Sequence, residues 1–432
     1  MKKWLKKAAV SALGLSLLPF GSANAIQEVA AQEPVEIEFW YGLGSEAGQK
    51  MEEIIQNFND SQSEVSVTGV SQASYSETEQ NIQAAMAAGN VPGAFIATPS
   101  TTNRLANDEY ILDLTELAEA NEDFVEENYL EAFIDLSTVN DSLYAIPAYG
   151  TTQVMYYNQD VYEQAGVDPE EAFSSWENLA EASKTIQEST DADYGHLPMW
   201  GAGNLIDIAY SNGGTILSDD GTQVTINSEE WVQAWEFIRT QLHDEQTMAV
   251  NSGGQGWEYW YQTIDQMLQG IGGGYTGSSG DKGNIDFSYI GSFPQPGLNG
   301  NPGAASAEVL QFVIPAQATP EQQEAAFKFM MYFTSPEVSA EWSMAIGYIP
   351  VNQTVMEDET YVAFLEENPH AAVPYEQALS GTPQFIDPTN GAIEDALSIA
   401  ADQVELQNVP AQEALDEAQA TAQEALDEIL SE

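Results

Sequence analysis

The sequence contains no cysteine. Disulfide bonds, thiol nucleophiles and cysteine-ligated metals are therefore excluded. A lipid-modified N-terminal cysteine is excluded too, so we expect a free protein rather than a lipid-anchored one. Histidine is almost as scarce, because only His196, His243 and His370 occur and they lie far apart. Since no H-x-x-x-H or G-x-S-x-G pattern is present, the sequence offers no motif for zinc-dependent or serine-dependent hydrolysis.

Basic residues are also few. Ten Lys and Arg stand against 68 Asp and Glu, and the formal net charge is −58. Nucleic acids and anionic membrane surfaces bind proteins through clustered Lys and Arg, so both are excluded as partners. An apolar fraction of 43% with nine tryptophans argues against disorder. A folded chain with so much like charge repels itself at low salt, and screening relieves the repulsion. We therefore infer a salty habitat.

No apolar run is long enough to span a membrane. The run from Ala8 to Phe20 has 13 residues, whereas a membrane-spanning helix needs about 20. Four lysines precede this run, and the small residues Ala23-Asn24-Ala25 follow it, which is typical of a secretion signal. We predict that residues 1–25 are a signal peptide, that residues 26–34 are an acidic linker, and that the mature protein is exported to the periplasm without inserting into a membrane.

The mature chain begins as an α/β protein. Residues 35–40 alternate apolar and polar side chains, residues 46–59 place apolar side chains on one face of a helix, and residues 65–70 form a second strand. The glycine-rich run 270–283 contains a G-x-G-x-x-G pattern, but no predicted strand precedes it and no helix start follows it. We therefore expect no dinucleotide and no other cofactor. With 432 residues, two domains are the default expectation.

The middle of the chain predicts a passage between two such domains. Two short strands are predicted at residues 143–147 and 153–158, with a small polar hinge at residues 148–152 between them. Pro147 lacks a backbone donor, so the first strand cannot continue as a central one, and Gly150 permits backbone angles closed to other residues. A strand that stops, bends and restarts can carry the chain from one lobe into another. An ordinary β-turn with a packed tyrosine is the alternative interpretation.

Four segments carry a resemblance to a known family. Residues 146–181, IPAYGTTQVMYYNQDVYEQAGVDPEEAFSSWENLAE, resemble the first lobe crossover of the extracellular solute-binding proteins that feed ABC importers, in the sugar and glycerol-phosphate branch. The other segments that resemble this family are EFWYGLGSEAGQKMEEIIQNFN, LPMWGAGNLIDIAYSNGG and SAEWSMAIGYIPVN. Nearly the whole mature chain is similar to the family in order and spacing.

The resemblance implies a two-lobed α/β fold of type II. Each lobe would be a mixed sheet flanked by helices, with a ligand cleft between the lobes. Residues 35–147 and 292–346 would form lobe one, and residues 148–291 and 347–432 would form lobe two. The tail repeats Gln-Glu-Ala-Leu-Asp-Glu at 412–417 and 423–428. Because eleven residues is about three helical turns, we predict an amphipathic closing helix, with a coiled-coil partner site as the alternative.

The resemblance also implies a ligand site that contains aromatic and hydroxyl side chains. Aromatic rings can cover the apolar C–H faces of a sugar, while hydroxyl and amide groups bind its rim. No catalytic and no metal-binding residues are expected. The ligand-binding residues that the resemblance implies are Trp40, Tyr41, Tyr75, Tyr149, Thr151, Trp200, Tyr275, Ser278, Tyr348, Asp387 and Asn390.

The expected function is that of a substrate-binding protein of an ABC importer. It would be a monomer that closes around a sugar, oligosaccharide or glycerol-phosphate-type ligand and docks on membrane permease subunits. Glycerol-phosphate-binding relatives hold the phosphate with an arginine, but the matching segment 385–391 has none. A neutral saccharide or polyol is therefore favoured, although Lys282 or a helix N-terminus could replace the arginine. The alternatives are a secreted polysaccharide-active enzyme and a structural protein of the envelope.

Overall fold

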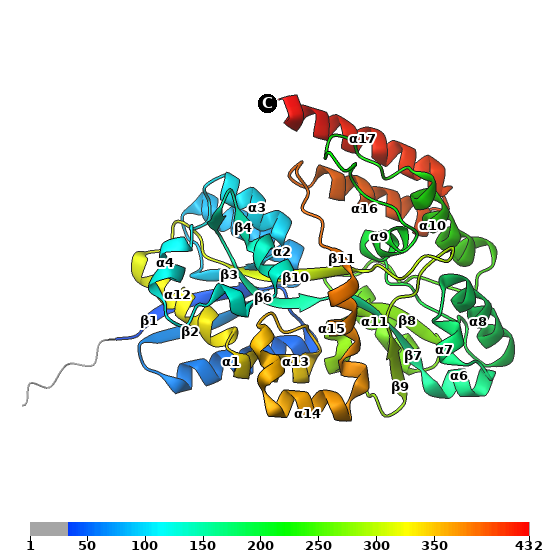
Figure 1. The fold of residues 1–432 in the computed structure, drawn as a ribbon, viewed down its shortest axis with the longest axis horizontal. Coiled ribbons are helices and arrows are strands. Elements are labelled where there is room, and N and C mark those ends of the chain that lie inside the picture. The colour runs from blue at the N-terminus through cyan, green and yellow to red at the C-terminus, as the bar shows by residue number, and fades with distance from the viewer. Residues whose placement is uncertain (1–32, 432) are drawn as a thin grey trace, which may run out of the picture. The chain divides into compact units, whose positions relative to one another are not determined.

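A computed structural model describes residues 33–431, and Figure 1 shows their fold. The predicted signal peptide, residues 1–25, and nearly all of the linker 26–34 lie outside the described residues. The described chain is an α/β structure with a six-stranded sheet, a three-stranded sheet and a short two-stranded ribbon made of β4 (Thr138–Val139) and β5 (Ser142–Leu143).

The six-stranded sheet is mixed. β1 pairs in parallel with β2 and with β3, while β10 pairs antiparallel with β3 and with β6. Every residue of β3 and of β6 is buried, as expected for strands that are covered on both faces. The strands of this sheet are β1 (Val35–Tyr41), β2 (Val65–Ser71), β3 (Ala94–Ala97), β6 (Ile146–Thr151), β10 (Ser306–Val313) and β11 (Thr382–Pro383).

The three-stranded sheet is antiparallel. Its central strand β7 (Gln153–Asn158) pairs with β8 (Gly274–Ser278) on one side and with β9 (Ile290–Phe293) on the other. A separate apolar core surrounds this sheet and contains Trp231 and Trp235, which are fully buried. These two tryptophans lie one helical turn apart on α10 (Glu229–Arg239), which places both on the buried face of that helix.

Helices cover both sheets. Those that pack in or beside the core of the first sheet are α1 (Ser45–Ser61), α2 (Tyr75–Ala88), α3 (Pro99–Asn107), α4 (Thr115–Ala120), α5 (Glu131–Ile134), α12 (Pro320–Phe333), α13 (Pro336–Ile346) and α14 (Glu359–Glu367). Those that pack in the cores around the second sheet are α6 (Gln159–Ala165), α7 (Pro169–Ala172), α8 (Trp176–Ser189), α9 (Ala202–Tyr210), α10, α11 (Glu258–Leu268), α16 (Ala392–Glu405) and α17 (Ala411–Ser431).

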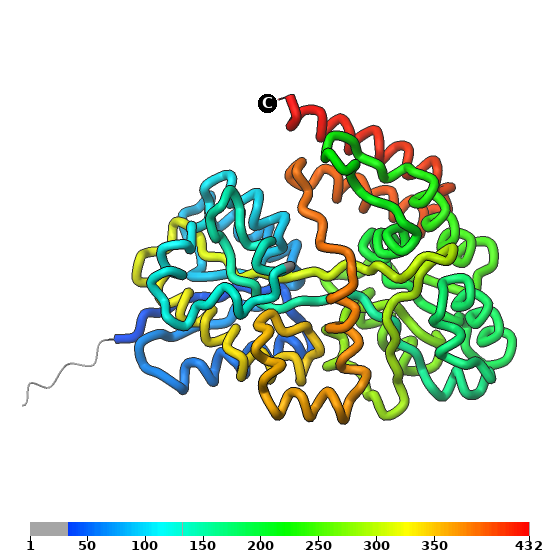
Figure 2. The backbone as a smooth tube through the Cα atoms, in the orientation of Figure 1, coloured from blue at the N-terminus to red at the C-terminus, as the bar shows by residue number. Residues whose placement is uncertain are grey.

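The chain passes between the two sheets three times, as the tube in Figure 2 shows. It passes at Thr152 from β6 to β7, again between Phe293 and Ser306, and a third time after β11 on the way to α16. α15 (Val373–Ser380) precedes the third passage and contacts strands of both sheets. The described chain is therefore the two-lobed α/β fold that was predicted. The exact residue limits of the lobes stay a prediction.

The first passage is shorter than predicted. The sequence analysis placed a polar hinge at residues 148–152, whereas β6 continues to Thr151 and only Thr152 lies outside both strands. β10 pairs with this stretch, and its register shifts between Leu310 and Gln311, so that Pro147 is accommodated within the strand. Because hydrogen bonds to β10 continue almost to the passage, the connection is a tight link between two paired strands.

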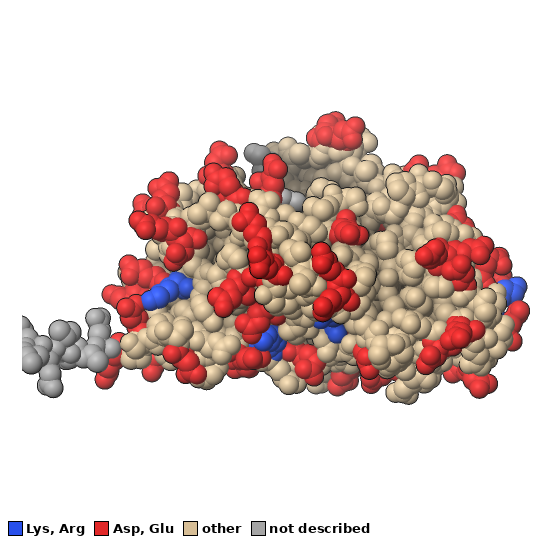
Figure 3. All heavy atoms as spheres, turned by 60° about the horizontal axis from the view of Figure 1, so that its bottom comes forward, with Lys and Arg blue, Asp and Glu red and all other residues tan. Residues whose placement is uncertain are grey.

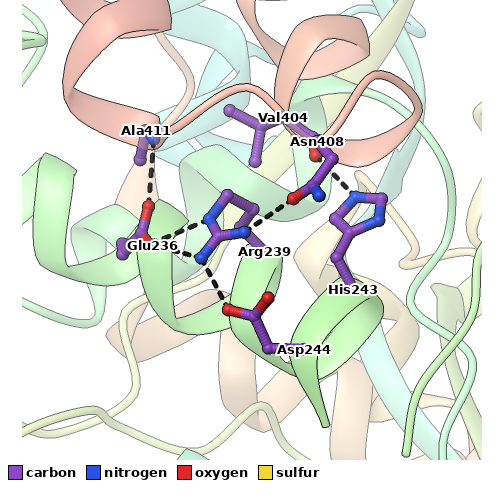
Figure 4. Close-up of polar contacts among 7 residues, drawn as sticks. All are labelled: Glu236, Arg239, His243, Asp244, Val404, Asn408 and Ala411. Atoms are coloured by element: carbon purple, nitrogen blue, oxygen red, sulfur yellow. Dashed lines mark hydrogen bonds and ion pairs between the residues drawn. The ribbon is translucent and has the colours of Figure 1, made fainter. Parts of the chain in front are cut away.

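Acidic side chains are spread over the face of the molecule seen in Figure 3, with only a few Lys and Arg among them. The described cations mostly occur in ion pairs, and Arg239 has the most partners (Figure 4). It donates to Glu236 at 2.8 Å, to Asp244 at 2.7 Å and to Asn408 at 2.6 Å. Glu236 also accepts the backbone N–H of Ala411, so this cluster fixes the start of α17 on α10.

We predict that Arg239→Met lowers the free energy of unfolding by about 1–3 kcal/mol, because it leaves Glu236 and Asp244 as adjacent, uncompensated carboxylates. Urea unfolding in 1 M salt provides the measurement. Lys184→Met is the matched control, since it removes one positive charge from an exposed position and should change stability by less than about 0.5 kcal/mol. Equal losses in the two variants would mean that net charge, and not the cluster, is responsible.

Candidate functional site

A cavity of about 340 Å³ lies where the two sheets meet. Its walls come from the loop after β1, the Thr152 junction, the start of α9, the start of α11 and the 3₁₀ turn Ser279–Asn284 after β8. In open α/β sheets, ligands bind outside the carboxyl ends of the strands, and the loop after β1 occupies such a position. Gly42 in that loop has to be a glycine, because a Cβ there would lie 2.3 Å from the backbone of Ser74.

Aromatic rings make up much of the cavity wall. α11 contributes an unusual run of four aromatic residues at its start, and neighbouring rings meet nearly edge to face. The rings of Trp257 and Trp260 are inclined at 81° with centroids 5.7 Å apart, and Tyr75 meets Trp257 at 76°. Such rings offer apolar faces in several directions to one ligand. The aromatic residues of the lining are Tyr75, Trp200, Trp257, Tyr259, Trp260, Tyr261 and Tyr348.

Trp200 is held from behind by α16. Its indole N–H donates to Asp402 Oδ1 at 2.8 Å, and its ring meets Tyr259 edge to face at 4.9 Å. The next backbone N–H, that of Gly201, donates to Glu405 Oε2 at 2.9 Å. Burial raises the pKa of Glu405 to about 8. These contacts fix the ring plane of Trp200 before any ligand enters, which lowers the entropy lost on binding.

Two acidic side chains line the cavity, and no described Lys, Arg or His does. Asp281 accepts from the Trp260 indole at 2.7 Å and from the Tyr275 hydroxyl at 3.1 Å. Burial raises the pKa of Asp281 to about 7. Glu308, on β10, has a pKa raised to about 7 by burial and by the charge of Glu394. The cavity is therefore poor in groups that attract an anion.

The predicted ligand-binding residues divide into three groups. Five line the cavity: Tyr75, Thr151, Trp200, Ser278 and Tyr348. Two lie one layer behind its wall, where the Tyr149 hydroxyl is 3.2 Å from that of Tyr75 and Tyr275 binds Asp281. Burial raises the pKa of both hydroxyls well above its ordinary value, so both stay neutral donors. As ligand contacts, all of these residues stay predictions.

The remaining four lie away from the cavity lining. Trp40 and Tyr41 are the last residues of β1, which ends just before the cavity begins. The Trp40 indole donates to Glu38, and the Tyr41 hydroxyl bonds to Glu52 of α1. Asp387 accepts four hydrogen bonds, from both polar groups of Thr389 and from the N–H groups of Ile393 and Glu394, so its carboxylate caps α16. Asn390 is exposed and has a φ of 57°.

Several lining residues were not predicted. The segment 257–261 contains four aromatic residues, and this density of rings is a signal in the sequence that could have indicated a ligand site. Asp281, Glu308, Gln153 and Asn204 had no distinguishing signal, because acids and amides are common throughout this chain. Tertiary structure alone brings these four to one cavity.

The described residues contain no group of three or more His, Asp or Glu that could hold a metal ion. Within residues 33–431, no helix has the combined length and apolar character that crossing a bilayer requires. The site thus presents rings, hydroxyls, amides and two carboxylates. This arrangement is suited to binding a small polar solute, and it belongs to a protein whose two lobes meet at the binding cavity.

Comparisons with known proteins support this class of solute-binding protein. The model of the bacterial extracellular solute-binding protein family matches residues 53–373, and the chain belongs to this family. The sn-glycerol-3-phosphate-binding periplasmic protein UgpB of Escherichia coli K12 is 26% identical over 412 residues, which cover 89% of this chain and 87% of UgpB. UgpB of Pectobacterium atrosepticum is 24% identical over 387 residues, which cover 84% and 83% of the two chains.

Solved structures show the same fold. The GacH receptor of Streptomyces glaucescens, solved unliganded and with acarbose, aligns with a TM-score of 0.82 at 15% identity, over 92% of this chain and 99% of GacH. UgpB of Mycobacterium tuberculosis in complex with glycerophosphocholine aligns with a TM-score of 0.80 at 22% identity, over 91% and 99%. The family and these relatives are binding proteins, which favours solute binding over the polysaccharide-active enzyme considered as an alternative.

The raised pKa values predict how stability depends on pH. An aspartate titrates near 3.9 when unfolded, whereas Asp281 titrates at about 7 in the folded protein. Its stabilising contribution is complete below about pH 4 and is lost as the pH rises through about 7, with a slope of up to about 1.4 kcal/mol per pH unit. Asp281→Asn should therefore flatten the fall in stability between about pH 4 and 7, as urea unfolding at each pH would show.

Asp219→Asn is the control for this prediction, because Asp219 is exposed and does not line the cavity. It removes the same formal charge, and we expect it to leave the slope unchanged. If both variants flatten the slope equally, general charge repulsion is the cause, and the burial of Asp281 is not.

Proposed function

We propose that this protein is the periplasmic substrate-binding component of an ABC importer for an uncharged carbohydrate-type solute, a saccharide or polyol. The observation that carries the proposal is the composition of the cavity wall: seven aromatic residues, several hydroxyl and amide groups, two acids and no described cation. Aromatic faces cover the C–H surfaces of a sugar, and hydroxyl groups bind carboxylates and amides at its edge.

The charge of the cavity disfavours a phosphate monoester as the ligand. UgpB of Escherichia coli is named for glycerol 3-phosphate, and a phosphate is best held by Arg or Lys. Lys282, the nearest cation in sequence to the cavity wall, bonds instead to the Met344 carbonyl and lies 5.1 Å from the Phe364 ring. A phosphate in the cavity would also meet Asp281 and Glu308. The family likeness therefore supports the transport role, while the residues support a different ligand.

The mechanism we propose is closure of the two lobes on the ligand. Contacts already join the walls of the cavity across the meeting of the lobes: Trp257 donates to the Gly42 carbonyl at 3.2 Å, and Ser45 donates to Asn284 at 2.6 Å. A ligand that touches both walls favours this closed arrangement by its differential affinity. The closed monomer would then dock on the membrane permease subunits, and a separate ATPase would drive transport.

A thermal-shift series in 2 M salt tests the ligand class. We expect glucose, maltose, sorbitol or glycerol to raise the melting temperature, since a ligand at 100 times Kd adds about 2.7 kcal/mol of stability. Glycerol 3-phosphate and glycerophosphocholine form the comparison arm. A response to the phosphate esters alone would overturn the uncharged ligand, and release of reducing sugar from a polysaccharide would favour the enzyme.

A pair of tryptophan variants tests the site. Trp200→Ala should weaken binding of the responding saccharide at least tenfold, because it removes a preorganised ring from the cavity wall. Trp40→Ala is the matched control, since Trp40 lies outside the lining, and should leave Kd within twofold even where it lowers stability. Calorimetric titration measures both constants. If Trp40→Ala weakens binding and Trp200→Ala does not, the ligand binds at the face of β1 that carries Trp40, and not in the cavity.

A further inference from the structure

The first turn of α9 forms one wall of the cavity and is not capped. Gly201, Ala202, Gly203 and Asn204 all line the cavity, and no side chain caps the helix. The first N–H groups of a helix have no partner within the helix. Gly201 uses its N–H on Glu405, whereas the N–H groups of the next three residues make no hydrogen bond to any described residue. Donors are therefore available at this wall.

Asn204 adds a more specific observation. Its side chain is 1% exposed, and neither its amide nitrogen nor its amide oxygen has a hydrogen-bond partner among the described residues. A buried polar group without a partner has lost its hydrogen bonds to water and gained none in return, so native structures rarely contain one without a reason. An asparagine one turn into a helix could bond back to the residue before the helix, but Asn204 does not.

Gln153 has the same property on the adjoining wall. Its amide oxygen is buried without a described partner, and it lines the cavity beside the start of α9. The two elements approach closely, because a Cβ on Gly203 would lie 3.1 Å from Gln153 Nε2. The backbone of Gln153 is fixed, since its carbonyl accepts from Gln295 at 3.1 Å and from Gln377 at 2.7 Å. The two amides therefore occupy one corner of the cavity on fixed elements.

The unpaired groups in this corner include both donors and acceptors. The donors are Asn204 Nδ2 and the N–H groups of α9, and the acceptors are Asn204 Oδ1 and Gln153 Oε1. A phosphate or carboxylate group can only accept, so it would leave both amide oxygens unpaired. A quaternary ammonium group neither donates nor accepts a hydrogen bond. A hydroxyl group does both, and two neighbouring hydroxyls match one side-chain amide, which donates from one end and accepts at the other.

We propose that Asn204, assisted by Gln153 and the uncapped start of α9, is a specificity-determining subsite for a pair of neighbouring hydroxyl groups on the ligand. The proposal rests on the proposed function, since it names the part of the solute that this corner of the same cavity recognises. A site built to bind a hydroxyl group rejects an analogue that lacks it, because the buried groups of the protein then lose their partners. Aromatic walls alone would not give that discrimination.

Asn204→Leu tests the subsite, because leucine has a similar size and no hydrogen-bonding group. We expect the variant to fold with an unchanged or higher melting temperature, since it removes two unpaired buried polar atoms. The saccharide among glucose, maltose and sorbitol that stabilises the wild-type protein most should bind the variant at least tenfold more weakly by calorimetric titration. Asn204→Asp, which keeps the acceptors and loses the donor, should also bind more weakly.

Monodeoxy forms of the same saccharide give the discriminating readout. The wild-type protein should bind at least one monodeoxy form at least tenfold more weakly than the parent sugar, and Asn204→Leu should bind the two within about threefold. An unchanged Kd for the parent sugar in Asn204→Leu, or the same deoxy discrimination in both proteins, overturns the subsite and leaves the proposed function standing. If the wild-type protein binds none of the saccharides or polyols, the proposed function fails, and the subsite fails with it.

Discussion

The arrangement of the binding cavity depends on the hydrogen bonds of one buried residue, Thr152. It is the only residue between β6 and β7, and its side chain donates to the Ser306 carbonyl at 2.7 Å while accepting from Gln377 at 2.6 Å. Its carbonyl accepts the Ser279 N–H at 2.9 Å. Thr152 therefore joins the first passage between the sheets to the start of β10, to α15 and to the turn that carries Asp281.

The junction between β6 and β7 is a single residue long, and its polar groups are buried. Asp207 extends the network, accepting from the Ser306 N–H at 2.8 Å and from Gln295 at 2.7 Å, and burial raises its pKa to about 7. In the closure proposed above, the axis of rotation would lie close to this paired stretch, because the chain passes directly from β6 to β7 there.

The excess of acidic over basic residues in this chain is also found in the lining of the cavity. The described cations are found outside its lining, and several of them hold elements together, as Lys50 does with Glu341 and Arg104 does with Glu79. Acids are spread over the face seen in Figure 3, and two of them, Asp281 and Glu308, line the cavity. Carboxyl groups at this wall can bind hydroxyl groups and give an anion no favourable partner, which supports the proposal of an uncharged ligand.

The sequence predicted the fold more completely than the site. Periodicity located β1, α1, β2 and the terminal helix α17, because each buries one regular apolar face. The family resemblance, and not periodicity, implied that Trp40 and Tyr41 bind the ligand; in the structure the cavity lining begins at the next residue, Gly42. The sequence does not show how deeply a side chain lies. Tyr149 and Tyr275 belong to segments that reach the cavity, but both lie behind the cavity wall, where their hydroxyls bond to Tyr75 and Asp281.

The amide and carboxyl side chains that prediction missed at the cavity share a physical character. Asn204 and Gln153 carry buried amides without described partners, and Asp281 and Glu308 have raised pKa values, so each is in an unfavourable environment for the protein alone. A sequence that specifies a stable fold satisfies such groups, and natural proteins depart from this rule mainly at functional sites. The missing partners are all of the kind that a hydroxyl-rich solute supplies. Binding such a solute would thus complete the hydrogen bonding of the interior, which couples lobe closure to the chemistry of the ligand.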